Sequence, residues 1–288
     1  MMSGLCHSVQ HTSRQIAEWT GTPYEKLRFL AAGVNHMAFL LKLEADGQDL
    51  YPKLRACLDR PEIYKKEKVR FEILRHFGYF PTESSGHNSE YLPYFRKRQD
   101  LIDRFCRNDF PEVDENGIDW NSMSAGVSGA SVQICRGLQI RNEKQIAGYL
   151  DGSREIDLAS SVEYGVQIIA AIEKNRPLAA NLNVMNRGLI ATLPPECCVE
   201  VPCLVDGGGI VPGRIEDFPE QLAAIDRGMV GAQILGAQGA LDGDRRAIFH
   251  AIAADPNTQS KLGLDEIRSM TDELFDALAD VIDPRFSR

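Results

Sequence analysis

The sequence lacks several features that would assign it to a class of protein. It has no run of about eighteen apolar residues, the length that a membrane-spanning helix needs. Its N-terminus has no basic region followed by an apolar segment, so we expect no export signal, no membrane contact and a cytoplasmic location. Positive charge is scarce: 32 Lys and Arg stand against 41 Asp and Glu, a net charge of −9. Because binding a polyanion draws on a clustered basic surface, we expect no nucleic-acid partner.

Cysteine pairs and nucleotide-binding glycines are also lacking. The seven cysteines form no C-x-x-C pair and no zinc-ribbon pattern, and in a reducing compartment we expect them to remain thiols. The one run of glycines, at 207–209, lies between two predicted strands and not between a strand and a helix. We therefore interpret it as a hairpin loop, and no segment predicts a Rossmann nucleotide site.

What is present is an α+β pattern in a chain of ordinary globular composition, 43% hydrophobic and 25% charged. Periodicity predicts helices at 8–20, 62–77, 159–174 and 265–282, another helix opening near Pro219, and strands at 26–32, 37–44, 178–184, 188–193 and 197–205. We expect an irregular excursion at 107–130, which is rich in Gly, Ser and Asn. On the helix at 62–77 the charged side chains, Arg70 among them, are expected to face water.

Two short segments place a metal-capable side chain where an apolar run meets a turn: Cys6 within 4–8 and His36 at the end of 32–36. A thiolate and an imidazole can bind a divalent transition metal and leave positions open for substrate oxygens. Their separation of about thirty residues matches no recognised ligand pattern. From the residues alone, a buried thiol and a hydrogen-bonded core histidine remain the simpler interpretation.

A third segment, 77–91, is dense in side chains that form hydrogen bonds. Such a loop suits a polar ligand, because it can grip hydroxyl groups while an aromatic ring packs on the apolar face of a sugar. Ser84 or Ser85 can instead cap a helix that runs through Tyr91 to Arg104. Both interpretations can hold together, since a helix N-terminus exposes hydrogen-bond donors.

Taken in their order and spacing, these segments resemble glycoside hydrolase family 4, in its branch of melibiase-type α-galactosidases, α-glucosidases and α-galacturonidases. The resembling blocks are GLCHSVQ at 4–10, AGVNHMAF at 32–39, DLYP at 49–52, VRFEILRHFGYFPTESSGH at 69–87, EYLPYF at 90–95, NRGLIATLPPECCVEVPCLVD at 186–206, DPNT at 255–258 and LDEI at 264–267. The resemblance implies that 1–288 corresponds to the family's C-terminal substrate- and metal-binding domain, a mixed antiparallel sheet with packed helices. It also implies that 1–25 is a remnant of the last Rossmann strand and helix, and that the N-terminal Rossmann domain is absent.

The resemblance further implies hydrolysis of an α-linked sugar by redox elimination and addition, which uses NAD⁺ and a divalent metal, typically Mn²⁺. In that scheme NAD⁺ takes a hydride from C3 of the sugar, the resulting ketone acidifies the C2 proton, and the metal polarises the C3 oxygen. Implied partners are a separate NAD-binding half and further copies of the chain in a homo-oligomer, a dimer or tetramer. The alternative is an inactive truncated remnant, or a sugar- or metal-binding subunit that needs the separate half.

Residue roles follow from the same resemblance. The metal is assigned to Cys6 and His36. His7 stands where phospho-glycosidase relatives carry an acidic proton donor, so it is a candidate acid or substrate contact, or alternatively a histidine turned away on the helix at 8–20. Asn35 is expected to contact a sugar hydroxyl or to orient His36. The candidates for the C2 base and for hydroxyl contacts are Glu83, Ser84, His87 and Tyr91.

Overall fold

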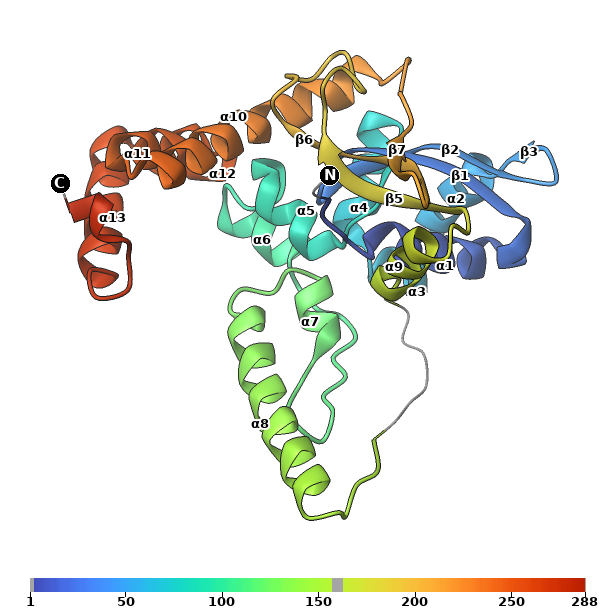
Figure 1. The fold of residues 1–288 in the computed structure, drawn as a ribbon, viewed down its shortest axis with the longest axis horizontal. Helices are drawn as coiled ribbons and strands as arrows, with labels where there is room; N and C mark the ends of the chain where they lie inside the picture. Colours follow the sequence, from blue (N-terminus) through green and yellow to red (C-terminus); the bar gives the residue numbers. More distant parts are fainter. Residues whose placement is uncertain (1–2, 157–162, 288) are drawn as a thin grey trace.

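The computed structural model describes residues 3–156 and 163–287, and its centre is a seven-stranded sheet (Figure 1). The main strand order is β3-β2-β1-β6-β5, with β4 beside β2 and β7 beside β6. The strands are β1 (Leu27–Val34), β2 (Met37–Ala45), β3 (Gln48–Asp49), β4 (Phe80–Pro81), β5 (Leu178–Met185), β6 (Cys198–Asp206) and β7 (Gly209–Pro212). Every pairing between these strands is antiparallel, so the predicted α+β class with an antiparallel sheet is confirmed.

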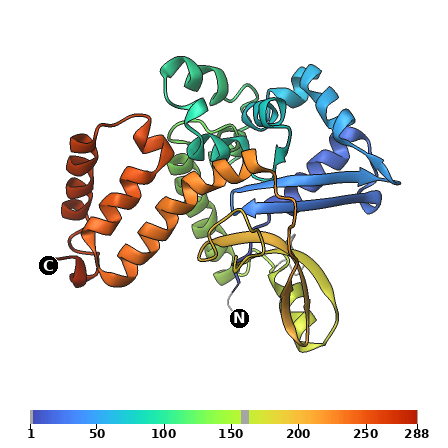
Figure 2. The same ribbon diagram turned by 90° about the horizontal axis from the view of Figure 1, so that it is seen from above.

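Helices cover the sheet and extend beyond it. They are α1 (Ser8–Thr20), α2 (Tyr51–Ala56), α3 (Pro61–Tyr64), α4 (Lys68–Phe77), α5 (Ser85–Tyr91), α6 (Gln99–Phe105), α7 (Trp120–Ser124), α8 (Ala130–Leu150), α9 (Gly165–Glu173), α10 (Glu220–Asp242), α11 (Arg245–Ala254), α12 (Pro256–Gln259) and α13 (Leu264–Ala277). Viewed from above, α10 runs away from the sheet to a C-terminal group of helices, where α11 packs on both α10 and α13 (Figure 2). Among the described helices, none combines the length and the apolar character that crossing a bilayer requires.

The sheet buries a hydrophobic cluster on each face. Consecutive side chains of a strand point to opposite faces, and Phe39 and Leu40 of β2 accordingly belong to different clusters. The Phe39 cluster includes Leu222 of α10, whereas the Leu40 cluster includes Ile16 of α1. The site described below lies at the end of β1 and β2, where α1 and α5 meet this two-sided core.

The prediction for 62–77 is wrong in two respects. The helix is broken into α3 and α4, and Arg70 is not on the surface but only 1% exposed. Its guanidinium donates to Gln15 Oε1 at 2.8 Å and to Thr12 Oγ1 of α1, and it lies 3.2 Å from Glu67. Lys68 and Glu72 are buried as well. Periodicity detects one apolar stripe of a helix, but it does not show that another element covers the polar stripe.

Other predicted elements need correction. Residues 188–193 form no strand, because Asn186 holds this segment as a turn by donating to the carbonyl oxygens of Ile190 and Leu193. The helix expected to run from Ser84 to Arg104 stops before Pro93, which cannot continue it, and resumes as α6. Part of the helix predicted at 159–174 falls outside the described residues, and its described part is α9. Pro219 caps α10 rather than opening it, and α13 ends earlier than predicted, at Ala277.

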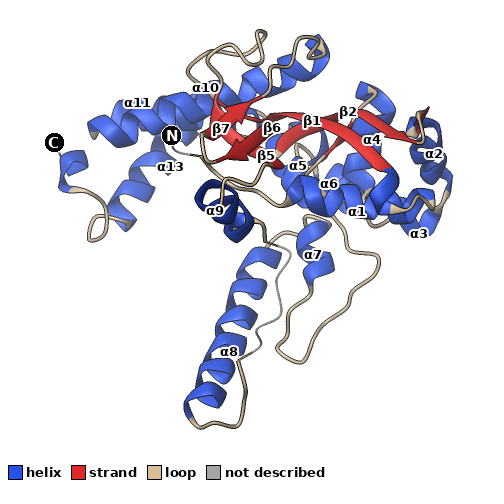
Figure 3. Ribbon diagram, turned by 45° about the vertical axis from the view of Figure 1, so that its right-hand side comes forward, coloured by secondary structure: helices blue, strands red, loops and turns tan. Residues whose placement is uncertain are grey.

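The region after Cys106 departs furthest from expectation. Most of 107–119 is irregular as predicted, but α7 lies within the predicted excursion and is followed by α8, a helix of 21 residues that the pattern did not predict. Helix α8 extends away from the sheet (Figure 3). Several of its apolar side chains, including Ile140, Ile146 and Leu150, are exposed, so there is no single apolar stripe from which periodicity could recognise the helix.

Candidate metal centre

Three segments far apart in the sequence meet at the end of β1 and β2. Cys6 precedes α1, His36 lies in the β1–β2 turn, and Glu83 lies between β4 and α5. One ligand atom from each, the Cys6 thiol, a His36 ring nitrogen and a Glu83 carboxylate oxygen, lies within 4.8 Å of the other two. All three residues are half-buried. We call these three residues the ligand cluster.

The N-terminal segment is held in place along the sheet. Gly4 exchanges backbone hydrogen bonds of 3.1 and 3.0 Å with Asn183 of β5. The hydroxyl of Tyr164 donates to the carbonyl oxygen of Cys6 at 2.8 Å and accepts from the Cys6 backbone N–H at 3.3 Å. These contacts fix the backbone of Cys6 on the sheet side of the site.

The β1–β2 turn that carries His36 has an unusual backbone. His36 has a φ of 67°, in the left-handed region of backbone conformation that few residues other than glycine and asparagine adopt. Just before the turn, Gly33 has a φ of 148°, and a Cβ there would lie 2.7 Å from Ala38 Cα. Asn88 of α5 donates to the carbonyl oxygen of His36 at 3.0 Å, so helix and turn are tied together.

Side chains of α5 and its N-cap complete the site. Glu83 Oε2 lies 3.7 Å from His36 Nε2 and 3.9 Å from the Cys6 thiol. On its other side, Glu83 Oε1 lies 3.5 Å from His87 Nδ1. The Tyr91 hydroxyl is 3.3 Å from His36 Nδ1, and Ser84 Oγ, which also caps α5, is 3.1 Å from His87 Nδ1. The structure therefore gathers six of the predicted site residues: Cys6, His36, Glu83, Ser84, His87 and Tyr91.

The surroundings of Glu83 and His36 favour the protonation states in which carboxylate and imidazole groups bind a metal ion. Burial would raise the pKa of Glu83, but the hydrogen bond with His87 and the backbone N–H of Ser84 outweigh it and lower the pKa to about 2. Burial lowers the pKa of His36 and so favours its neutral, metal-binding form. The hydrogen bond with Glu83 raises the pKa of His87. At neutral pH the site thus offers the carboxylate of Glu83 and the neutral imidazole of His36.

Two predicted residues lie outside this group. His7, the N-cap of α1, has a largely exposed side chain whose Nδ1 lies 3.2 Å from Glu163. Asn35 lies in the turn beside His36, and its buried Nδ2 has no hydrogen-bond partner. Their predicted roles as acid and as sugar contact remain predictions.

The sequence analysis missed one residue, Glu200 of β6. Its side chain is fully buried, and neither carboxylate oxygen has a hydrogen-bond partner. Burial, and then the negative charges of Cys6 and Glu83, raise its pKa to about 8. The signal that could have found it is a single acid within the apolar run of 197–205. Buried charges without a partner are costly, and such a residue in the middle of a strand points to a function.

The donor set fits a divalent transition metal. Thiolate, imidazole and carboxylate are the ligands that such ions bind in proteins, and three protein ligands leave positions open for substrate. The described residues do not fit a dinucleotide. Their named strands pair only antiparallel, and the glycine run at 207–209 lies in the hairpin between β6 and β7, as predicted.

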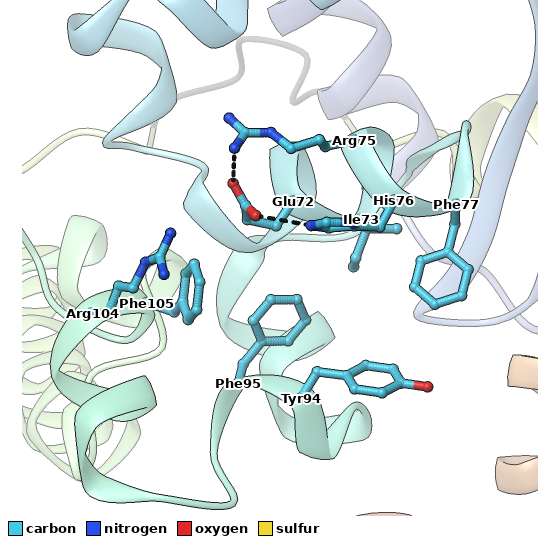
Figure 4. A pocket seen from close by; sticks show the side chains of 9 residues that line it. All are labelled: Glu72, Ile73, Arg75, His76, Phe77, Tyr94, Phe95, Arg104 and Phe105. Carbon is cyan, nitrogen blue, oxygen red and sulfur yellow. Dashed lines mark ion pairs between the residues drawn. The ribbon is translucent and has the colours of Figure 1, made fainter.

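A separate cavity of about 520 Å³ lies on the outer side of α4. Figure 4 shows its aromatic rings and the ion pairs of Glu72 with Arg75 and His76, at 3.3 and 3.4 Å. Its lining residues are Glu72, Ile73, Arg75, His76, Phe77, Tyr94, Phe95, Arg104 and Phe105. None of the predicted site residues is among them, so this cavity does not form part of the candidate metal centre.

Comparison with known families gives a match over most of the chain. Residues 31–258 match the family profile described as "Family 4 glycosyl hydrolase C-terminal domain". The chain is 35% identical over 278 residues to an alpha-galactosidase of Bacillus subtilis (strain 168), covering 96% of this chain and 60% of that protein. It is 32% identical over 283 residues to an alpha-galactosidase of Rhizobium meliloti (strain 1021), covering 96% and 55%. The chain thus spans less than two thirds of the length of these relatives.

Solved structures show the same fold. A 6-phospho-alpha-glucosidase from gut microorganisms, in complex with NAD and Mn²⁺, superimposes with a TM-score of 0.70 at 14% identity, over 95% of this chain and 60% of that chain. A 6-phospho-beta glucosidase from Thermotoga maritima, with manganese, NAD⁺ and glucose-6-phosphate, gives a TM-score of 0.68 at 15% identity, over 98% and 60%. At 14% and 15% sequence identity, these structural similarities show a shared fold and nothing about function.

Proposed function

Because the chain belongs to family 4 of the glycosyl hydrolases, as its C-terminal domain, we propose that it supplies the metal- and sugar-binding part of an α-glycosidase. The observation that carries this proposal is the convergence of Cys6, His36 and Glu83 within 4.8 Å. Relatives named alpha-galactosidase, alpha-glucosidase and alpha-galacturonidase support an α-linked sugar as substrate, and the two alpha-galactosidases described above, at 35% and 32% identity, favour an α-galactoside.

We propose that the ligand cluster holds Mn²⁺, with NAD bound by residues outside those described here. The solved 6-phospho-alpha-glucosidase that is named with NAD and Mn²⁺ supports both cofactors. When bound, a divalent metal at this position polarises a substrate oxygen and stabilises the negative charge that develops on it. We propose Glu83 as a third ligand beside Cys6 and His36, because its carboxylate lies within 4.8 Å of both other ligand atoms, whereas the sequence suggested that it contacts the sugar or acts as the C2 base.

The chain's own side chains would move protons around the bound sugar. His87 is our candidate acid, because its hydrogen bond with Glu83 keeps it protonated closer to neutral pH. Tyr91 is our candidate base or hydroxyl contact beside His36. Burial raises the pKa of Tyr91, so a nearby positive charge is needed before its hydroxyl can lose its proton and the phenolate oxygen can act as the base. Ser84 positions His87 by capping α5, and its backbone N–H donates to Glu83 at 2.8 Å.

A titration with Mn²⁺ tests the metal part of the proposal. We expect the chain to bind Mn²⁺, and we expect Cys6→Ser, His36→Ala and Glu83→Gln each to weaken binding by about 100-fold or more, since each removes a ligand. Cys198→Ser, which changes an exposed thiol, is the matched control and should bind like the parent chain. If the three variants retain the parent affinity, the metal assignment is wrong.

An assay of cleavage tests the catalytic part. The substrates are aryl α-galactosides, α-glucosides and α-galacturonides, with Mn²⁺, NAD⁺ and a thiol reductant. Because the described residues hold no dinucleotide site, a second candidate is a sugar- or metal-binding subunit without turnover of its own. Turnover by this chain alone would exclude that second candidate. Mn²⁺ binding without turnover, even after addition of a nucleotide-binding half from a relative, would favour it.

Assembly into a dimer or tetramer and a cytoplasmic location remain predictions. Exposed leucines on the C-terminal helices, Leu264 and Leu274 among them, offer apolar surface for the contact between copies. Sedimentation of the purified chain measures its oligomeric state directly.

A further inference from the structure

Glu200 lies directly between the two backbone segments that carry Cys6 and His36. On β6 it pairs with Gly33 of β1, three residues before His36. On the other side it pairs with Asn183 of β5, which in turn bonds to Gly4, two residues before Cys6. The row Gly33, Glu200, Asn183 and Gly4 therefore crosses the sheet beneath the ligand cluster.

The face of β6 that carries Glu200 is the one turned to the site. Its neighbours Val199 and Val201 pack in the cluster that contains Leu222 of α10, so Glu200 points to the opposite face. There its carboxyl group lies within electrostatic range of Cys6, Glu83 and His36. Glu200 is nevertheless not a member of the ligand cluster. Among the described residues, only Cys6, His36 and Glu83 bring their ligand atoms within 4.8 Å of one another.

The surroundings of Glu200 compensate a negative charge only weakly, because His36 and the Asn35 side chain lower its pKa less than burial, Cys6 and Glu83 raise it. Neither carboxylate oxygen has a hydrogen-bond partner, and the buried Nδ2 of Asn35 and Oδ1 of Asn183 have none either. The buried cation Arg70 is already paired with Glu67. Without a cation nearby the carboxyl group of Glu200 therefore tends to hold its proton, and a divalent cation bound beside it would favour the carboxylate.

We propose that Glu200 is a positioning residue of the metal centre, a buried counter-charge that strengthens the binding of a divalent cation by Cys6, His36 and Glu83 without itself being a ligand. This inference rests on the proposed function of the cluster as a metal site. Groups outside the ligand shell commonly change metal affinity about 10- to 100-fold, because they set the orientation and charge of the ligands. Glu200 is placed to do this through its charge, and through its pairing with Gly33, which lies just before the turn that carries His36.

The test compares two equally buried carboxyl groups on opposite faces of the sheet. Asp226 of α10 is also fully buried with both oxygens unpartnered, but Val34 and Cys197, not the ligand cluster, are its neighbours. Mn²⁺ affinity is measured on the full chain from the electron paramagnetic resonance signal of the free ion. We expect Glu200→Gln to weaken Mn²⁺ binding about 10- to 100-fold and Asp226→Asn to leave it within about twofold.

A second readout separates this role from a structural one. Without metal at pH 7, Glu200→Gln should unfold at the same temperature as the parent chain or higher, since glutamine replaces a carboxyl group that its raised pKa keeps largely protonated. With saturating Mn²⁺ its gain in melting temperature should be smaller than that of the parent. Should the glutamine variant not fold, Glu200→Leu, which needs no hydrogen-bond partner, replaces it with the same expectation.

The outcomes are distinct. Parent-like Mn²⁺ affinity in Glu200→Gln overturns this inference and leaves the proposed metal site intact. An equal loss of affinity in Asp226→Asn overturns it too, because the effect would then come from the core and not from the site. Failure of the parent chain to bind Mn²⁺ overturns the proposed metal site and this inference together.

Discussion

The side-chain amide of Asn88 donates a hydrogen bond of 3.0 Å to the backbone carbonyl oxygen of His36. Asn88 lies on α5 between His87 and Tyr91, so this one bond joins the turn that carries the candidate ligand His36 to the helix that carries two candidate catalytic side chains. Asn88 is fully buried, and no other donor to that carbonyl oxygen is recorded in the described part of the chain. The geometry of the site therefore depends on a contact between elements about fifty residues apart in the sequence.

Replacing Asn88 should loosen the site. Asn88→Ala leaves the part-buried carbonyl oxygen of His36 without a donor and a cavity in place of a fully buried side chain, and we expect it to lower the free energy of unfolding by about 1–3 kcal/mol. It should also weaken Mn²⁺ binding, since His36 is held less firmly. Urea unfolding and Mn²⁺ titration measure the two effects. Asn121→Ala removes a comparable but exposed bond of 2.9 Å to Phe110, and a similar loss there would contradict the argument.

Removing the guanidinium of Arg70 should be among the most destabilising single changes. Arg70→Met leaves Glu67 as an unpaired buried carboxylate and breaks the bond to Gln15, so we expect a loss of about 3–5 kcal/mol. Arg70 lies 5.9 Å from the ring of Trp19, whose fluorescence can report unfolding in urea. Arg75→Met, on the exposed side of the same helix, should cost less than about 1 kcal/mol. Equal effects of the two substitutions would show that burial of Arg70 is unimportant.

Asp226 should make stability depend on pH. Burial raises the pKa of its carboxyl group well above the ordinary 3.8. The folded chain therefore holds this proton more tightly than the unfolded chain, and stability falls as the pH rises above about 4 until the raised pKa is passed. Asp226→Asn should remove this loss, with a gain of about 1–3 kcal/mol at pH 8 and none below about pH 4.

Urea unfolding at a series of pH values measures this difference. Asp242→Asn, at the exposed C-terminal end of the same helix, should change stability by less than about 0.5 kcal/mol at every pH. A gain from Asp226→Asn that is the same at pH 4 and pH 8 would rule out titration of this carboxyl group as its source.

Gly33→Ala should distort the turn that presents His36. The new Cβ would lie 2.7 Å from both Ala38 Cα and the carbonyl oxygen of Met37, and the φ of 148° is unfavourable for alanine. We expect a loss of about 1–3 kcal/mol, measured by thermal unfolding, together with weaker Mn²⁺ binding. Gly231→Ala, in the middle of α10 with open space around it, should instead stabilise by about 0.4–1 kcal/mol. Two changes of the same sign would refute this reading of Gly33.

The sequence by itself determined the elements whose signal is local. Helix α1 has the predicted bounds, and β1, β2 and the turn at Asp46 and Gly47 lie within a few residues of their predicted positions. The periodicity of hydrophobic residues and the residues that favour turns act over a few positions, so both can be recognised from the sequence without knowledge of the fold. The family and the pairing of Cys6 with His36 also came from the sequence, through blocks whose order and spacing resemble known relatives.

Only the tertiary structure decided which polar side chains are buried and which of them meet. Arg70 and Glu200 each lie in a stretch whose local pattern says nothing of the element that covers them, α1 in one case and the N-terminal segment in the other. Glu83 joined the ligand cluster because β4 and α5 bring it against the β1–β2 turn. Burial arises from contacts between distant segments, and for that reason the position of Glu200 beneath the ligand cluster is a property of the fold.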